Sequence, residues 1–267
     1  MMKTKSLFIL LCFNLFFLAC QSTEPKGLLT LEEVSSTTFL GGTLISSMED
    51  YAFFESALRL NYKQAPFQVR NIAWPADDIF GLARSQFGSA QNTQSWQPPT
   101  AEEGFGSKVL LKHLRAVDPT TLFLGYGTEA AYFKNEEDLN LFKSGYTRLL
   151  DTLEAKSIRM VLMSPPKQEA SFLASEKVAV RNEWLHKVSD FIQTEAQERN
   201  QLFVDLFNQL ITDPTQKTYT HNGLQLNEAG YQKMAKILCS TLEIPVVENT
   251  LNKEKSDQLI NLIKEKN

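Results

Sequence analysis

The sequence predicts an α/β protein, a three-layer α/β/α sandwich on a five-stranded, mostly parallel sheet. Short apolar runs alternate along the chain with longer segments in which apolar residues recur at helical spacing, and no internal repeat interrupts this order. Strands that alternate with helices are joined by right-handed crossovers, which cover both faces of a parallel sheet with helices. These observations favour a single layered domain.

In the first half of the chain, apolar runs predict strands at residues 37–42 and 67–73, with a helix at 48–62 between them. The polar segment 88–106 contains proline and glycine, which predicts a surface loop. A helix at 107–117 follows this loop.

The second half continues the alternation, with further strands at 121–125, 158–163 and 202–206. Apolar residues spaced three or four apart predict a helix between the first two of these strands: Leu139, Phe142, Tyr146, Leu149 and Leu153. A second helix carries Leu185, Val188 and Ile192, and Asn227 is expected to cap a third. Residues 246–267 predict an amphipathic helix packed on the domain, and a detached partner-binding helix is the alternative.

Composition is that of an ordinary globular protein. The 267 residues are 43% hydrophobic and 22% charged, with a formal net charge of −4. An acidic, moderately charged chain argues against disorder and against nucleic-acid binding. The three histidines are widely separated and the three cysteines form no CxxC pair, so we expect neither a metal site nor a cofactor.

The first twenty residues have the features of a targeting segment. Lys3 and Lys5 precede an apolar run at residues 7–18, which is too short to span a bilayer. The run ends in Phe-Leu-Ala-Cys20, which resembles a bacterial lipobox and implies cleavage before an acylated Cys20. We therefore expect a membrane-anchored lipoprotein of the cell envelope, with residues 21–33 as a tether and 34–245 as the domain. Plain secretion is the alternative.

Ligands of parallel sheets bind at the carboxyl ends of the strands. The segments expected at these ends are residues 41–44, 73–77, 125–129, 164–166 and 220–231. In this order they resemble the blocks of the SGNH, or GDSL, hydrolases, a family of esterases and deacetylases, and more narrowly its planctomycete-type branch. The strongest part is NGLQLNEAGY, which is similar to the family's DGxHLNxxGY. The resemblance covers roughly residues 37–242 and implies a flavodoxin-like SGNH-hydrolase fold.

The resemblance also assigns family roles to five positions of this chain. The nucleophilic serine corresponds to Thr43, and the triad aspartate and histidine correspond to Asn222 and Gln225. The glycine and asparagine of the oxyanion hole correspond to Ala76 and Glu129. Every functional position of the family pattern is therefore substituted.

These substitutions remove the chemistry of acyl transfer. A threonine hydroxyl needs a base to take its proton, and the amide of Gln225 cannot act as one. Asn222 is neutral and cannot stabilise an imidazolium, while an ionised Glu129 would repel a developing oxyanion. We therefore expect a decayed esterase, a pseudoenzyme.

Three hypotheses about function follow. In the first, the former active-site cleft binds a glycan, an acylated sugar or an envelope protein partner. Trp74 and Tyr126 could stack on a sugar ring, and packing within the domain is the alternative for each. In the second, Thr43 still hydrolyses esters, with Glu129 or His221 as a substitute base. In the third, the domain is an interaction scaffold recruited through the 88–106 loop or the C-terminal helix.

Overall fold

The computed structural model describes residues 29–30, 33–62, 68–81, 83, 105–170, 173–211, 218–244 and 253–266. The expected leader with Cys20 lies outside these residues, as does most of the expected tether. The expected loop at 88–106 also lies outside them, except for its last two residues, which begin a helix.

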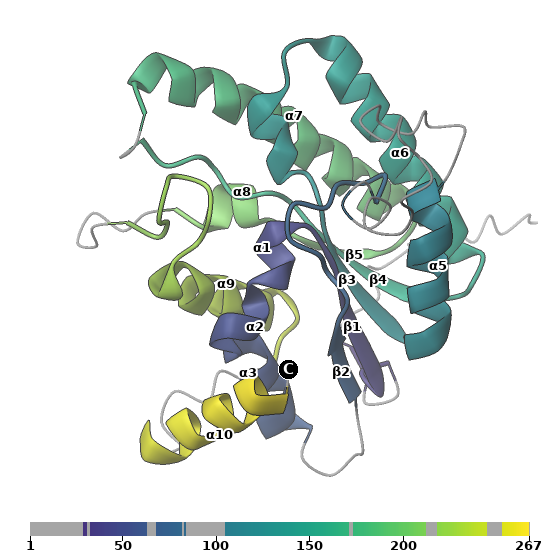
Figure 1. Ribbon diagram of the computed structural model, residues 1–267, viewed down its shortest axis with the longest axis vertical. Helices are drawn as coiled ribbons and strands as arrows, with labels where there is room; N and C mark the ends of the chain where they lie inside the picture. The colour runs from purple at the N-terminus through teal and green to yellow at the C-terminus, as the bar shows by residue number, and fades with distance from the viewer. Residues whose placement is uncertain are drawn as a thin grey trace, which may run out of the picture.

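A single five-stranded sheet forms the middle layer of the protein (Figure 1). Its strands are β1 (Ser36–Gly41), β2 (Gln68–Asn71), β3 (Thr121–Gly125), β4 (Arg159–Met163) and β5 (Leu202–Val204). Their spatial order is β2-β1-β3-β4-β5, and every neighbouring pair is parallel. The predicted fold class is confirmed, with a sheet that is wholly parallel.

Helices cover both faces of the sheet (Figure 1). One face is covered by α5 (Phe105–Val117), α6 (Glu136–Glu154) and α7 (Ser175–Glu198). The other is covered by α1 (Thr43–Ser46), α2 (Met48–Tyr51), α3 (Phe53–Asn61) and α9 (Glu228–Thr241). Successive side chains of a strand point to opposite faces, so Phe39 joins one hydrophobic core and Leu40 the other.

The prediction of one continuous helix at 48–62 is wrong, because the segment forms two helices, α2 and α3. Ala52 adopts a left-handed conformation with φ of 54°, which ends α2 and separates it from α3. The predicted strand at 202–206 is too long, because Asp205 accepts a hydrogen bond from the Asn208 N–H and caps the short helix α8 (Leu206–Gln209). Residues 121–125, in contrast, form the predicted strand with the predicted bounds.

The C-terminal helix α10 (Lys253–Lys266) lies against α2 and α3 (Figure 1). Ile263 on this helix is only 3% exposed, so the helix buries its apolar face in the domain. Within the described part of the chain, no helix is both long and apolar enough to cross a membrane.

The order of the strands positions the site. The chain leaves β1 toward β2 and returns to β3 on the other side of β1, so the loops after β1 and β3 diverge. Such a switch point opens a crevice at the carboxyl ends of the two strands. The segments that follow β1 and β3 carry Thr43 and Glu129, respectively.

Candidate functional site

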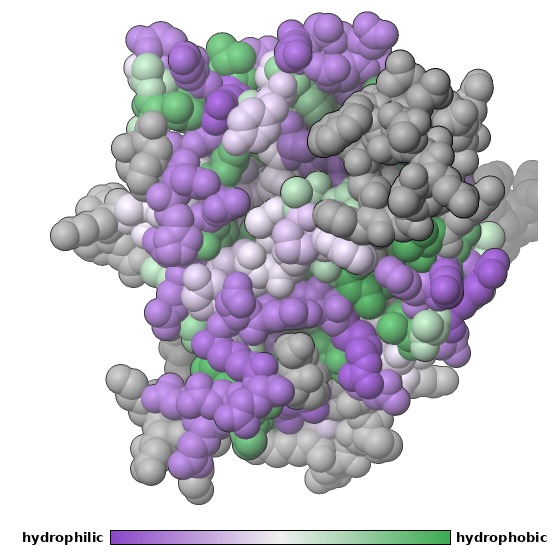
Figure 2. Space-filling model, viewed as in Figure 1, coloured by the Kyte–Doolittle hydropathy of each residue, from purple (hydrophilic) through white to green (hydrophobic). Residues whose placement is uncertain are grey.

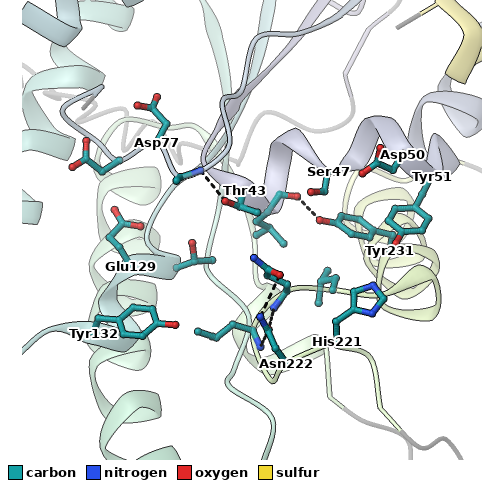
Figure 3. Close-up of a pocket in the computed structure, with 17 residues that line it drawn as sticks. Thr43, Ser47, Asp50, Tyr51, Asp77, Glu129, Tyr132, His221, Asn222 and Tyr231 are labelled. Carbon is teal, nitrogen blue, oxygen red and sulfur yellow. Dashed lines mark hydrogen bonds between the residues drawn. The ribbon is translucent and has the colours of Figure 1, made fainter. Parts of the chain in front are cut away.

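A cavity of about 430 Å³ lies at this edge of the sheet. It is lined by α1 and α2, by the loop after β2, by the 3-10 helix η1 (Thr128–Tyr132) after β3, and by the loop before α9. The structure brings all six predicted pocket residues to its wall: Thr43, Ala76, Glu129, His221, Asn222 and Gln225 (Figure 3). On the face shown in Figure 2, residues of intermediate hydropathy gather in the centre, with hydrophilic residues to the left of them and below them.

Thr43 opens α1 directly at the carboxyl end of β1. Its Oγ1 accepts a hydrogen bond of 2.9 Å from the backbone N–H of Ala76. Ala76 has φ of 59°, a left-handed conformation that favours glycine, the family residue at this position. The N–H that would face an oxyanion in the family pattern therefore donates to the hydroxyl of Thr43 itself (Figure 3).

Gly42 explains why the loop after β2 lies so close to Thr43. A Cβ atom on Gly42 would lie 2.6 Å from the backbone oxygen of Asp77, closer than atoms can approach. Any larger side chain at this position would not fit unless the loop moved. The absence of a side chain at Gly42 therefore permits the present position of the loop.

Asp77 lines the cavity and also holds that loop in place. Its carboxylate is buried and accepts hydrogen bonds from the Ala83 N–H and the Tyr126 hydroxyl, each at 3.2 Å. Tyr126 is 2% exposed, so the expectation that it could stack on a sugar ring is wrong. Trp74 stacks on the His113 ring with centroids 6.5 Å apart.

Asn222 and Gln225 form a hydrogen-bonded pair where the family has its acid and base. The Asn222 Nδ2 atom donates to Gln225 Oε1 at 3.2 Å. The Asn222 Oδ1 atom accepts from the N–H groups of Leu224 and Gln225 at 3.1 and 2.9 Å (Figure 3). The two side chains thus contact each other, as the aspartate and histidine of a catalytic triad would. Neither amide can take a proton at neutral pH.

The loop that carries this pair is fixed by a residue that the sequence did not reveal. Glu169, on the segment after β4, accepts a hydrogen bond from the Tyr219 N–H at 2.7 Å and others from the hydroxyls of Thr218 and Thr220. Its own N–H donates to the carbonyl of Gly223 at 2.8 Å. No motif marked Glu169, because its partners lie some 50 residues further along the chain.

Two tyrosines that the sequence did not single out form the opposite wall. The Tyr231 hydroxyl donates to the carbonyl of Leu44 at 2.9 Å, which joins α9 to α1. Its ring stacks on Tyr51, with centroids 4.7 Å apart. This wall of the cavity is therefore aromatic and firmly held.

Glu129 is the most unusual group in the cavity. Its Oε2 atom accepts the Gly127 N–H at 2.9 Å, while Oε1 is shielded from solvent and has no hydrogen-bond partner among the described residues. Burial raises the pKa of Glu129 to about 7, and the negative charges of Asp78 and Asp77 add to this effect. The backbone hydrogen bonds act in the opposite direction.

His221 is exposed at the rim of the cavity. In Figure 3 its imidazole lies on the Tyr231 side of the cavity, away from Thr43. The backbone N–H of His221 donates to the Gln225 carbonyl at 2.8 Å, which closes the loop. In this arrangement the imidazole is not presented to the Thr43 hydroxyl.

A second cavity of about 290 Å³ adjoins the first and shares Asp78, Glu129 and Tyr132 with it. Apart from Asp138, the rest of its lining is apolar: Ile79, Phe80, Phe133, Leu141 and Phe142. Tyr132 and Leu141 are 62% and 50% exposed, so the cavity is open at this end. Among the described residues, no group of three or more histidine, cysteine or carboxylate side chains could hold a metal ion.

The fold matches that of known esterases. An acetylxylan esterase from Geobacillus stearothermophilus, solved as a catalytic mutant, aligns with a TM-score of 0.57 and 12% identity over 80% of this chain and 96% of its own. A lipase/acylhydrolase from Enterococcus faecalis aligns with a TM-score of 0.55 and 14% identity, over 78% of this chain and 95% of its own. A GDSL-like lipase from Bacteroides thetaiotaomicron aligns with a TM-score of 0.51 and 12% identity, over 81% of this chain and 91% of its own. No protein-family model and no curated protein sequence matches this chain.

Proposed function

We propose that this chain, which has the fold of the SGNH/GDSL esterases, is an envelope-anchored lipoprotein that has lost ester hydrolysis and uses its cavity to bind an acylated carbohydrate. The observation that carries the proposal is the Asn222–Gln225 pair. By the sequence resemblance the pair corresponds to the family's aspartate and histidine, and its two amides offer no base to Thr43. A hydroxyl nucleophile without a base is weak at neutral pH.

The two adjoining cavities support a ligand with a polar part and an apolar part. The larger one is lined mainly by hydroxyl, amide and carboxylate side chains, which suits a sugar. The smaller one has the apolar lining that an acyl group requires. Two of the similar structures are an acetylxylan esterase and a lipase/acylhydrolase, whose names refer to acylated compounds. An envelope protein that presents a polar and an apolar group together is the other ligand class that fits.

The loss of hydrolysis is tested with a small activated acetyl ester, such as p-nitrophenyl acetate. We expect the purified protein and its Thr43→Ala variant to hydrolyse the ester at the same low rate, because the Thr43 hydroxyl is not activated. The variant is needed since activated esters react slowly with many proteins. A rate that falls at least tenfold in the variant would refute the proposal.

One observation favours a second candidate, an ester hydrolase that uses Thr43 and Glu129. Glu129 lines the same cavity, and its pKa of about 7 suits a general base at neutral pH. If hydrolysis depends on Thr43, the variants Glu129→Gln and His221→Ala identify the base, because only the one that lacks it loses the rate.

The proposed anchor is tested by metabolic labelling with palmitate in a bacterial host. We expect the wild-type chain to carry the label and to fractionate with membranes, and the Cys20→Ser variant to lose both properties. Cys12→Ser is the matched control, because Cys12 lies inside the leader that is removed. Equal labelling of the Cys20→Ser variant would show that Cys20 is not the acylated residue.

A further inference from the structure

The charge of the cavity restricts the ligand further. Four carboxylate residues line it, namely Asp50, Asp77, Asp78 and Glu129, and among the described residues no lysine or arginine does so. The adjoining cavity adds Asp138 and again no described lysine or arginine. Anionic ligands would therefore meet like charges on several sides, which costs binding free energy.

Arg181 contacts one of the lining residues, Tyr132, but its side chain is already engaged. The Arg181 guanidinium lies over the Tyr132 ring, 4.6 Å from its centroid, and donates to Gln168 Oε1 at 3.1 Å. Arg181 itself lines neither cavity.

Among the lining carboxylates, Glu129 is the one with a buried oxygen, Oε1, that has no hydrogen-bond partner among the described residues. Both oxygens of Asp77 accept hydrogen bonds from the protein, and Asp78 Oδ1 accepts the Phe80 N–H at 3.0 Å. Asp50 is exposed at the rim. Glu129 Oε1 is shielded from solvent and has no partner among the described residues, although Glu129 lines both cavities.

A cationic hydrogen-bond donor satisfies such an oxygen best. Leaving a buried carboxylate oxygen without a partner is costly, and a charged donor gains more there than a neutral one. The cavity also offers the rings of Tyr51, Tyr132 and Tyr231, and aromatic faces attract cations. The Glu129 oxygen and the tyrosine rings therefore both favour a cationic ligand.

We infer that the carbohydrate in this cavity carries a free, protonated amino group that donates a hydrogen bond to Glu129 Oε1. This inference rests on the proposed function, since it names the class of sugar for the same site. An amino sugar places an ammonium group directly on a ring of the size that the cavity admits. Acylation of that nitrogen would remove the charge and with it the preference.

The inference is tested by calorimetric titration at neutral pH with two matched probes, the β-1,4-linked trimer of glucosamine and its fully N-acetylated form. We expect the free amine to bind about 10- to 100-fold more tightly, as a charge-assisted hydrogen bond would provide. Glu129→Gln should reduce this preference to about twofold or less, because the amide keeps the size but not the charge. Glu136→Gln, an exposed glutamate outside both cavities, is the control and should retain the full preference.

Three results would overturn the inference. They are equal or tighter binding of the N-acetylated trimer, an unchanged preference in Glu129→Gln, and no binding of either trimer at millimolar concentration. Tighter binding of the N-acetylated trimer would still agree with carbohydrate binding. Hydrolysis that depends on Thr43 would instead refute the proposed function, so the two failures are distinguishable.

Discussion

Glu129→Gln is expected to make the protein more stable at alkaline pH and to leave its stability unchanged below about pH 5. The pKa of Glu129 is raised from 4.5 to about 7, so the folded protein holds a proton that the unfolded chain has released between these values. Stability therefore falls as pH rises through this window, by about 3 kcal/mol in total. Glutamine does not ionise and avoids this loss.

The measurement is urea unfolding of both proteins at about pH 5, pH 7 and pH 8.5. The difference in unfolding free energy should be small at the lowest pH and should reach about 3 kcal/mol in favour of the variant at the highest. Glu136→Gln controls for the general effect of removing one negative charge. A pH-independent difference would show that Glu129 ionises as readily in the folded protein as in the unfolded chain.

Restoring the family residues is expected to create ester hydrolysis in this chain. The changes are Thr43→Ser, Ala76→Gly, Glu129→Asn, Asn222→Asp and Gln225→His. Side chains at 222 and 225 already contact each other, and Glu169 fixes their loop, so the new acid and base should be positioned without a new backbone. We expect hydrolysis of p-nitrophenyl acetate to rise by about a thousandfold or more.

The informative control is the same variant with Gln225 left unchanged. It contains the serine and the oxyanion donors but no base, and its rate should stay close to that of the wild-type protein. If the full set of changes also leaves the rate unchanged in a folded protein, side-chain loss alone does not explain the missing chemistry. The close approach of the Asp77 loop to Gly42 would then be the structural obstacle.

The sequence predicted the layers of the fold well because they depend on local periodicity. The run at 121–125 became β3 with its predicted bounds, and Asn227 caps α9 by accepting the Gly230 N–H at 3.0 Å. The break at Ala52 could not be predicted, because a left-handed alanine carries no signal of its own.

The sequence indicated which residues line the candidate site, but not which hydrogen bonds they make. The family resemblance pointed to five positions, and His221 was added as a possible substitute base; the structure brings all six around one cavity. The resemblance could not indicate that the Ala76 N–H donates to Thr43, that Asp77 is committed to Tyr126, or that one oxygen of Glu129 has no described partner. The first two features depend on contacts between residues 33 and 49 positions apart, which no local pattern encodes.

The most direct test of the central claim is covalent labelling with a fluorophosphonate, which reacts with activated hydroxyl nucleophiles and releases fluoride. Intact-mass measurement of the wild-type protein should show no adduct, because Thr43 has no base. The restored variant serves as the positive control and should gain one adduct at position 43. A wild-type adduct on Thr43 that disappears in Thr43→Ala would show that the hydroxyl is activated and that this protein is an enzyme.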